Sequence, residues 1–526
     1  MSEIHTGIVV LAFGAYTLAI VLVGVYSARY ARNSDEDFFL AGRSLGSWTA
    51  ALSASASSES GWVTLGLVGW AFGSGVSAYW IIPGCLLGFM FNWFVLAGRL
   101  RQRAGELHAL TLPDLFAMHF RERIPVLRSL TVLVILVSML LYVAAQFAAA
   151  GKAFAATFER YFQMLASSVF HSGCEGVDYH VGVIAGALIV LLYTVTGGFR
   201  AVCWTDFLQA LLMVVTLIFF PLLLLFREGG YAYIFGQFQQ DATGQGLLSF
   251  IPPFNTQAQT AALIGFLLGH GALGINFGYP GQPHVLVRFM ALKSRREALV
   301  GGIISVVWAG LVYWGAVTVG LMARAMTIAQ VPWTGKLLES ATSKELGLVV
   351  SALHMLPEVL SGLVLAAILA AICSTADSQL VVAASAVAND LYARLFEKSG
   401  RTAHLLVNRM TVLVLGVLAV LLVINRDLTV YEYVLTYGWA MLGASFGPQV
   451  ILLLLWRRAS YAGCLAGMLV GFLVAVIWPN VYDEAATGVH VYNLPLAFVC
   501  GLVANVLVSL MFPSRHADAP DARHPG

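Results

Sequence analysis

The sequence predicts an all-α polytopic membrane protein with about 13 transmembrane helices. Apolar residues make up 59% of the 526 and charged residues only 11%, whereas soluble domains hold about a quarter charged residues. The mean hydropathy is +0.82, and apolar runs long enough to cross about 30 Å of hydrocarbon recur along the chain. No soluble core could bury so much apolar surface. The net charge of +2 gives no strong field, so we expect a lipid bilayer and no nucleic acid as partner.

The first apolar run, residues 7–26, is long for a signal peptide and lacks a clear small-residue cleavage site, so we expect it to remain as the first span. The longest connections, about 151–180, 227–258 and 323–349, are expected outside, with room for short helices. One transmembrane domain, 1–513, then precedes a short cytoplasmic tail, 514–526. The later spans are predicted near residues 47–68, 77–98, 127–150, 181–197, 203–226, 259–280, 299–322, 350–380, 408–424, 432–456, 461–478 and 492–512.

The Lys and Arg positions predict the orientation, because cytoplasmic connections retain positive charge. With the amino terminus outside and the carboxyl terminus in the cytoplasm, roughly three quarters of the 29 Lys and Arg residues lie inside. Arg128 and Arg288 belong to this inside set, and Lys152 to the outside set.

The sequence carries no enzyme signature. Its six cysteines show no CxxC spacing, its 12 histidines form no HExxH pattern, and there is no GxxxxGK[ST] run for a nucleotide. An ion gradient is therefore the energy source that the sequence leaves open.

The segment from Ser53 to Trp62 contains five serines, Glu59 and Gly61 inside a stretch that would otherwise span. Buried polar groups are costly in lipid, and irregular backbone survives at that depth only where it lines a cavity. Small residues also serve plain helix packing, but this density of polar groups favours a broken helix. Its freed carbonyls would face a cation or a small polar solute.

Two prolines and three glycines interrupt a second apolar run in the segment from Gly274 to His284. Tyr279 could offer its ring and hydroxyl to a solute there. The alternative, equally weighted, is a helix end that enters the cytoplasmic connection at Arg288.

A third polar feature lies between Ala370 and Gln379. Ala371, Ser374, Thr375 and Ser378 share one helical face by their spacing. Their oxygens suit a hard cation such as sodium, although hydroxyls also bond back to their own helix. Asp377 favours an ion site, since a carboxylate within a membrane needs a partner or a proton.

Asp206 is the other acid expected inside the membrane, and it lies near Arg200 in sequence. A structural ion pair and a role in ion passage are equally open. His270 and His284 could carry protons, but a lone histidine is more often a packed core or loop residue.

Short motifs in order along nearly the whole chain resemble the sodium:solute symporter family, and most closely its proline-carrying members. These motifs are Phe39–Gly46, Thr49–Ala54, Ser60–Trp62, Ala97–Leu100, Leu110–Asp114, Gly197–Phe199, Trp204–Asp206, Gly281–His284, Ala367–Ala371 with Ser374 and Thr375, and Asp390–Tyr392. The resemblance implies a leucine-transporter-type 5+5 inverted repeat with one extra amino-terminal and two extra carboxyl-terminal helices, each repeat opening on one broken helix.

The resemblance also implies the site residues. Sodium would bind the backbone carbonyls of Ala56, Glu59 and Ala371 and the hydroxyls of Ser374 and Thr375. A candidate second ion site comprises Asp206, Asp377 and Ser378. The implied solute contacts are Ser60, Gly61, Trp62, Tyr142, Tyr279, Gln282 and Pro283.

The implied activity is sodium-coupled uptake of a small amino acid, L-proline first, across the bacterial inner membrane, with no cofactor beyond sodium and no protein partner indicated. Two departures keep alternatives open. Ser58 stands where the proline symporters carry an aspartate, and the acid Glu59 comes one residue later, which is about 100° around a helix. Ile275 replaces a tryptophan of their solute pocket. The alternatives are coupling to protons in place of sodium, transport of another amino acid or small carboxylate in place of proline, and a solute sensor built on the same fold.

Overall fold

The computed structural model describes residues 35–170, 177–195, 198–241, 246–251, 259–340, 342–396, 401–426, 428–483 and 489–513, with Ala486 and scattered residues between 7 and 26. Much of the predicted first span and all of the predicted tail, 514–526, therefore lie outside the described residues. The described residues form helices and connections without a strand, apart from one isolated bridge between Leu45 and Leu292. The all-α prediction is confirmed.

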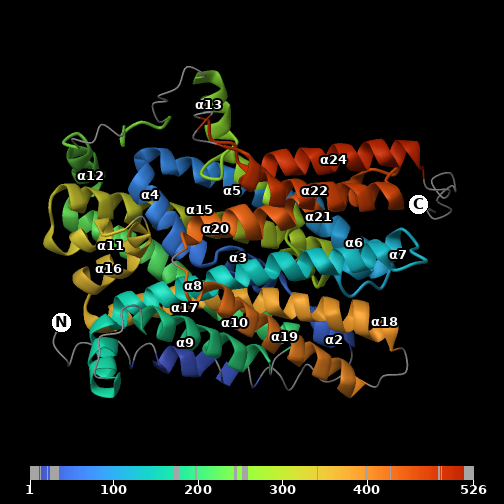
Figure 1. Ribbon diagram of the computed structural model, residues 1–526, viewed down its shortest axis with the longest axis horizontal. Helices are drawn as coiled ribbons and strands as arrows, with labels where there is room; N and C mark the ends of the chain where they lie inside the picture. The colour runs from blue at the N-terminus through green and yellow to red at the C-terminus, as the bar shows by residue number, and fades with distance from the viewer. Residues whose placement is uncertain are drawn as a thin grey trace.

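Nine helices in the described part of the chain are long and apolar enough to cross a membrane. The long helices run side by side along the long axis of the molecule (Figure 1). They span Trp62–Glu106, Val126–Phe158, Phe199–Glu228, Arg295–Ile328, Glu358–Tyr392, Ala403–Val423, Val430–Leu455, Tyr461–Val481 and Asn493–Met511. The total of about 13 spans and the inverted repeat stay predictions.

The amino-terminal half begins with short helices and continues into long ones. Its elements are α2 Asp35–Leu40, η2 Ala41–Arg43, α3 Ser47–Ser58, η3 Trp62–Leu67, α4 Val68–Ser74, η4 Gly75–Trp80, α5 Ile81–Met90, η5 Phe91–Ala97, α6 Gly98–Glu106, α7 Leu112–His119, α8 Val126–Phe170, α9 Val177–Thr194, α10 Phe199–Val214, η6 Val215–Phe219, α11 Phe220–Glu228 and α12 Gly230–Phe238.

The carboxyl-terminal half begins with a short helix and a break. Its elements are α13 Gln259–Leu267, η7 Leu273–Gly281, α14 Pro283–Met290, α15 Arg295–Ile328, η8 Pro332–Leu338, η9 Ser343–Leu346, α16 Gly347–Met355, α17 Glu358–Ser385, η10 Ala386–Tyr392, α18 Ala393–Leu395, α19 Arg401–Val423, α20 Val430–Tyr433, η11 Val434–Trp439, α21 Ala440–Leu455, α22 Tyr461–Val481 and α24 Asn493–Met511.

Three predicted segments have different bounds in the structure. The window 259–280 is not one helix, because α13 ends at Leu267 and the chain turns before η7. The window 350–380 is divided at Pro357, which lacks the N–H that an uninterrupted helix needs there. The predicted connection 151–180 is helical as far as Phe170, as a continuation of α8.

Large apolar side chains cover much of the helix exterior. Phe226 of α11 is 90% exposed and Leu421 of α19 is 65% exposed. A water-soluble protein rarely exposes so many large apolar groups, so these helix faces fit a lipid environment. The interior holds the fully buried rings of Trp62, Trp93 and Trp439.

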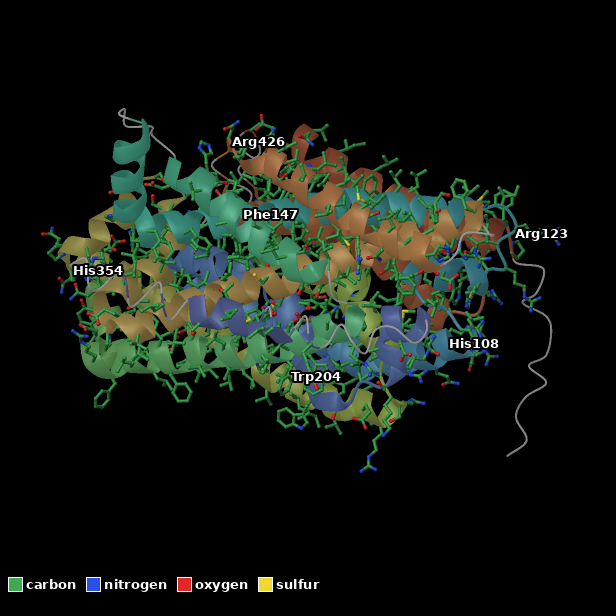
Figure 2. The ribbon with its side chains drawn as sticks, turned by 90° about the horizontal axis from the view of Figure 1, so that it is seen from below. His108, Arg123, Phe147, Trp204, His354 and Arg426 are labelled. Atoms are coloured by element: carbon green, nitrogen blue, oxygen red, sulfur yellow. The ribbon has the colours of Figure 1, made fainter. Side chains whose placement is uncertain are left out.

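The connections divide between the two ends of the bundle. His108 and Arg123 lie at one end, whereas His354 lies at the other (Figure 2). The charge distribution predicts the His354 end to face outside, and we call it the outer end.

Three basic residues counted as connection charges are instead buried in ion pairs. Arg288 contacts Asp206 at 2.8 Å, and Lys152 contacts Glu345 at 2.8 Å. Arg128 lies between two carboxylates, those of Asp114 and Asp390. The prediction of connection positions was wrong for these three, although the excess of the other basic residues on the predicted inside is still large.

Candidate functional site

The first predicted break is present in α3. The helix ends at Ser58, and Glu59 has φ −95° and ψ 75°, outside the helical region. The chain resumes helical structure at Trp62. Because Glu59 leaves the helical conformation, the carbonyls around it lose regular helical partners and become available to a ligand.

Helix α17 packs its hydroxyl face against this break. Ser374 Oγ donates to the Ala56 carbonyl at 3.0 Å and to the Ala371 carbonyl at 3.1 Å. Thr375 Oγ1 donates to the carbonyls of Ala56 at 3.4 Å and Ser57 at 3.1 Å. The structure therefore brings together four of the five predicted sodium ligands, and it places Glu59, the fifth, at the break itself. Oxygen atoms that lie this close to one another can share one hard cation.

The predicted second ion site contains a guanidinium group. Arg288 Nη2 lies 2.8 Å from Asp206 Oδ2 and 2.5 Å from Ser378 Oγ, and Arg288 Nε donates to Ser53 Oγ at 2.9 Å. Asp377 belongs to the same cluster, because its Oδ1 accepts from Ser378 Oγ at 3.2 Å. A positive charge from the protein itself therefore lies among these oxygens.

The structure does not pair Asp206 with Arg200, the basic residue near it in sequence. Arg200 donates instead to the Ala41 carbonyl and to Ser44 Oγ, both at 2.9 Å. Arg288 does not enter a cytoplasmic connection either, since its side chain is fully buried in α14. The structure thus favours the ion-pair interpretation of Asp206, with a partner from another helix.

Four of the predicted solute residues lie beside the break. The Ser60 hydroxyl accepts from Gln146 Nε2 at 3.1 Å, and the Gly61 N–H donates to Gln146 Oε1 at 3.0 Å. A Cβ on Gly61 would lie 2.8 Å from that of Ala149, so no larger residue fits here without a shift. Trp62 is buried, and its indole N–H donates to the Ser58 carbonyl at 2.9 Å. Tyr142 is fully buried on α8, one helical turn from Gln146.

The other three solute residues belong to the second break. Tyr279 lies in η7 with its hydroxyl 2.8 Å from that of Tyr313. Gln282 Nε2 donates to the carbonyls of Gly278 and Trp439, at 3.1 and 3.2 Å. Pro283 starts α14 and lines a small pocket with Thr111 and Ser385. Trp62 and Tyr279 do not line this small pocket.

Sequence reasoning missed three residues of this region. Gln146 stands alone as an amide in an apolar run, a signal that could have been followed. Tyr313 gives no sequence signal, because aromatic residues are common in spans. Arg288 was assigned to a connection from its charge alone.

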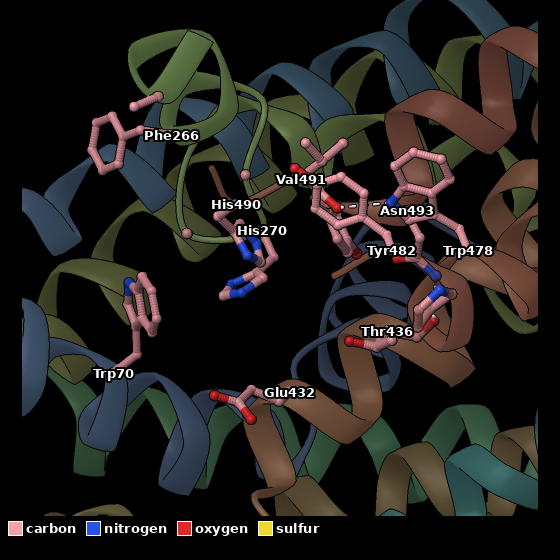
Figure 3. A pocket seen from close by; sticks show the side chains of 15 residues that line it. Trp70, Phe266, His270, Glu432, Thr436, Trp478, Tyr482, His490, Val491 and Asn493 are labelled. Carbon is pink, nitrogen blue, oxygen red and sulfur yellow. Dashed lines mark hydrogen bonds between the residues drawn. The ribbon is translucent and has the colours of Figure 1, made fainter. Parts of the chain in front are cut away.

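A large cavity opens at the outer end, with a volume of about 590 Å³. In Figure 3, His270 and His490 lie side by side on the wall of this cavity, which Glu432 also lines. The Trp70 ring meets the His270 ring edge-on at 4.9 Å. The Trp70 ring stacks on Tyr431 at 5.2 Å, and Tyr431 in turn lies 6.2 Å from Trp62. An aromatic layer thus separates this cavity from the first break. The predicted proton carrier His270 belongs to the cavity wall, whereas His284 is buried in α14.

Comparisons with known proteins fit this architecture. Residues 38–471 match the model of the sodium:solute symporter family. The chain is 32% identical over 506 residues to the osmoregulated proline transporter OpuE of Bacillus subtilis, covering 96% of this chain and 94% of that protein. It is 34% identical over 501 residues to the sodium/proline symporter of Escherichia coli, covering 95% and 92%. A solved structure of a sodium-coupled sialic acid symporter in a substrate-bound, outward-open state has a similar fold, with a TM-score of 0.72, 19% identity, and 97% and 98% of the two chains covered.

Proposed function

This chain belongs to the sodium:solute symporter family, and from that premise we propose that it takes up a small amino acid, most directly L-proline, by symport with sodium. Sodium-coupled solute symport by a multi-pass membrane protein is the general activity that this membership supports. The proposal includes proline as the solute and the bacterial plasma membrane as the location. It also places the amino terminus outside. The identity of about a third to proline transporters supports the choice of solute.

One observation carries the proposal, namely the convergence of α17 hydroxyls and α3 carbonyls at the first break. Ser374 and Thr375 both reach the Ala56 carbonyl from another helix. A sodium ion held there would tie α3 to α17 and favour the conformation in which the two helices are together. Solute binding at the same break would then favour the sodium-bound state, since coupling between two sites is reciprocal.

The sodium gradient supplies the energy. Moving one elementary charge inward releases about 2.3 kcal/mol per 100 mV of membrane potential. Every 1.4 kcal/mol is about a tenfold concentration ratio, so one sodium ion per cycle sustains considerable accumulation without ATP.

The break also offers groups that suit an amino acid. Trp62 and Tyr142 supply apolar rings, and Ser60 with the nearby backbone supplies polar groups. Ile275 does not offer the aromatic wall implied by the family resemblance: its side chain lies against Gly84 of α5, and its carbonyl accepts from Trp439 Nε1 at 3.1 Å. Another small amino acid is therefore the second solute to test.

The test is uptake of labelled L-proline into proteoliposomes under an imposed sodium gradient, a proton gradient or neither, with unlabelled amino acids as competitors. Sodium-driven uptake that proline competes is expected. Uptake driven only by protons, or uptake of another solute while proline is excluded, would contradict sodium/proline symport.

The sodium site is tested in the same assay with Ser374→Ala combined with Thr375→Ala. The two hydroxyls that donate to α3 carbonyls are then lost, so sodium stimulation should fall at least tenfold. Ser385→Ala is the matched control, because the Ser385 hydroxyl bonds to its own helix, at the Val381 carbonyl, and to no other helix in the described part of the chain. Unchanged sodium stimulation in the double variant would show that sodium binds elsewhere.

A further inference from the structure

The backbone and the side chain of Glu59 contact different parts of the molecule. The backbone lies at the α3 break, among the proposed sodium ligands, while the carboxylate reaches α15 and accepts a hydrogen bond from the Tyr313 hydroxyl. Both residues are fully buried. Among the described residues Glu59 forms no ion pair, so Tyr313 is the polar partner that the structure shows for this carboxylate.

The Tyr313 hydroxyl also contacts a residue of the second break. It lies 2.8 Å from the Tyr279 hydroxyl. A tyrosine hydroxyl carries a single proton, and that of Tyr313 is directed at Glu59. An ionised carboxylate can only accept hydrogen bonds. With Glu59 in that form, Tyr313 accepts the proton of Tyr279, and the order of donation runs from Tyr279 through Tyr313 to Glu59.

The Tyr279 ring is held in place independently of this chain of hydrogen bonds. It packs on Gly88 of α5, where an added Cβ would lie 2.1 Å from the ring, and it meets Trp439 edge-on at 4.8 Å. The remaining freedom of this side chain is the direction of its hydroxyl proton. Among the described residues, Cys85 also lies near these hydroxyls, but a thiol is only a weak donor and acceptor.

We propose that Glu59 and Tyr313 are positioning residues that hold the Tyr279 hydroxyl as a hydrogen-bond acceptor for the ammonium group of the solute. With its proton committed to Tyr313, the Tyr279 oxygen offers only lone pairs to a ligand. The site thereby selects a solute with N–H donors. This inference rests on the proposed function and adds a recognition element to it.

The same arrangement links sodium binding to solute recognition. Glu59 contributes its carbonyl to the proposed sodium site and its carboxylate to the Tyr313 contact, so movement of one residue changes both sites. Coupling of this kind appears as a sodium-dependent change in solute affinity, and it is equal in both directions.

The experiment measures binding of L-proline, and of its analogue tetrahydro-2-furoic acid, to the full-length protein in nanodiscs with and without sodium. The analogue has a ring oxygen in place of the ammonium group. Tyr313→Phe keeps the ring beside Trp62, 5.9 Å away, but removes the hydroxyl. We expect this variant to bind proline about tenfold more weakly in the presence of sodium. The ratio of proline affinity to analogue affinity should fall by about the same factor. Tenfold corresponds to the loss of one hydrogen bond to a charged group.

Two Glu59 variants distinguish the effect of the acceptor oxygen from the effect of side-chain packing. Glu59→Gln retains an oxygen that accepts from Tyr313 and should stay within about threefold of the wild type, whereas Glu59→Leu should resemble Tyr313→Phe. Combining Glu59→Leu with Tyr313→Phe should add little, because both remove the same contact. Tyr231→Phe is the matched control, since its hydroxyl bonds Tyr79 of η4 and Thr318 and Trp314 of α15 rather than Glu59 or Tyr279.

The outcomes are distinct. A wild type whose affinity for L-proline is independent of sodium would overturn the proposed function and, with it, this inference. A sodium-dependent wild type with unchanged affinity and discrimination in Tyr313→Phe would overturn the inference alone. Equal losses in Glu59→Gln and Glu59→Leu would also overturn it, because the acceptor oxygen would then not matter.

Discussion

Removal of the Arg288 charge should destabilise the protein strongly unless Asp206 is neutralised too. Both side chains are fully buried and lie 2.8 Å apart. In Arg288→Met the methionine fills much of the space of the arginine stem. Among the described residues, Asp206 then keeps the hydroxyl donors of Ser53 at 2.7 Å and Ser57 at 3.3 Å and no cation. A buried carboxylate that loses its cation typically costs about 3–5 kcal/mol.

The double variant Arg288→Met with Asp206→Asn isolates the charge. Replacing both partners of a buried ion pair is often close to neutral, so the double variant should recover at least about 2 kcal/mol of the loss. The assay is the free energy of unfolding by SDS in mixed micelles, followed by tryptophan fluorescence. Arg200→Met is the control with an expected change below about 1 kcal/mol, since Arg200 has neutral partners and is partly exposed.

The reasoning would be refuted by a single variant within about 1 kcal/mol of the wild type, or by a double variant no more stable than the single one. Either result would mean that Asp206 does not depend on the Arg288 charge in the folded protein.

Two further predictions concern Gln146 and His119. Gln146→Ala should weaken solute affinity about tenfold, because the Ser60 hydroxyl and the Gly61 N–H both lose a partner. The control in the binding measurement is Thr157→Ala, because the Thr157 hydroxyl donates to the Ala153 carbonyl of its own helix. Unchanged solute affinity in Gln146→Ala would contradict the prediction. His119 lies outside the spans, where burial and the Arg103 guanidinium lower its pKa to about 4 and its Nδ1 accepts from Arg103 Nε at 3.1 Å. The unfolded chain binds this proton more readily, near pH 6.5, so stability should decline as the pH falls from about 6.5 toward 4. His119→Gln should show a shallower decline in unfolding midpoint, and parallel pH profiles would exclude His119 as the cause.

The break in α3 shows how far local sequence reasoning reaches. Five serines, Glu59 and Gly61 in one span were enough to predict it, because lipid offers no partners to polar groups. The shared face of Ser374 and Thr375 was equally predictable from helical spacing, and the structure places it against Ala56. That these residues bind sodium stays a proposal.

Arg288 shows where the same reasoning stops. An arginine after an apolar run is usually a connection residue, and nothing nearby in sequence announces its partner Asp206, which lies on α10. The side-chain direction of Glu59 was similarly undetermined, since it depends on how α15 packs beside the break.

The sequence by itself determined the membrane class, the helical content and the positions of the polar interruptions, because the bilayer imposes hydrophobic length and backbone satisfaction on every local segment. Only the tertiary structure decided which distant polar groups meet. The pairing of Asp206 with Arg288, and the contact of Glu59 with Tyr313 and Tyr279, depend on helix packing between residues far apart in the chain. Buried charges and hydroxyls pair with the polar groups that helix packing places within hydrogen-bond distance. The local sequence does not determine which groups these are.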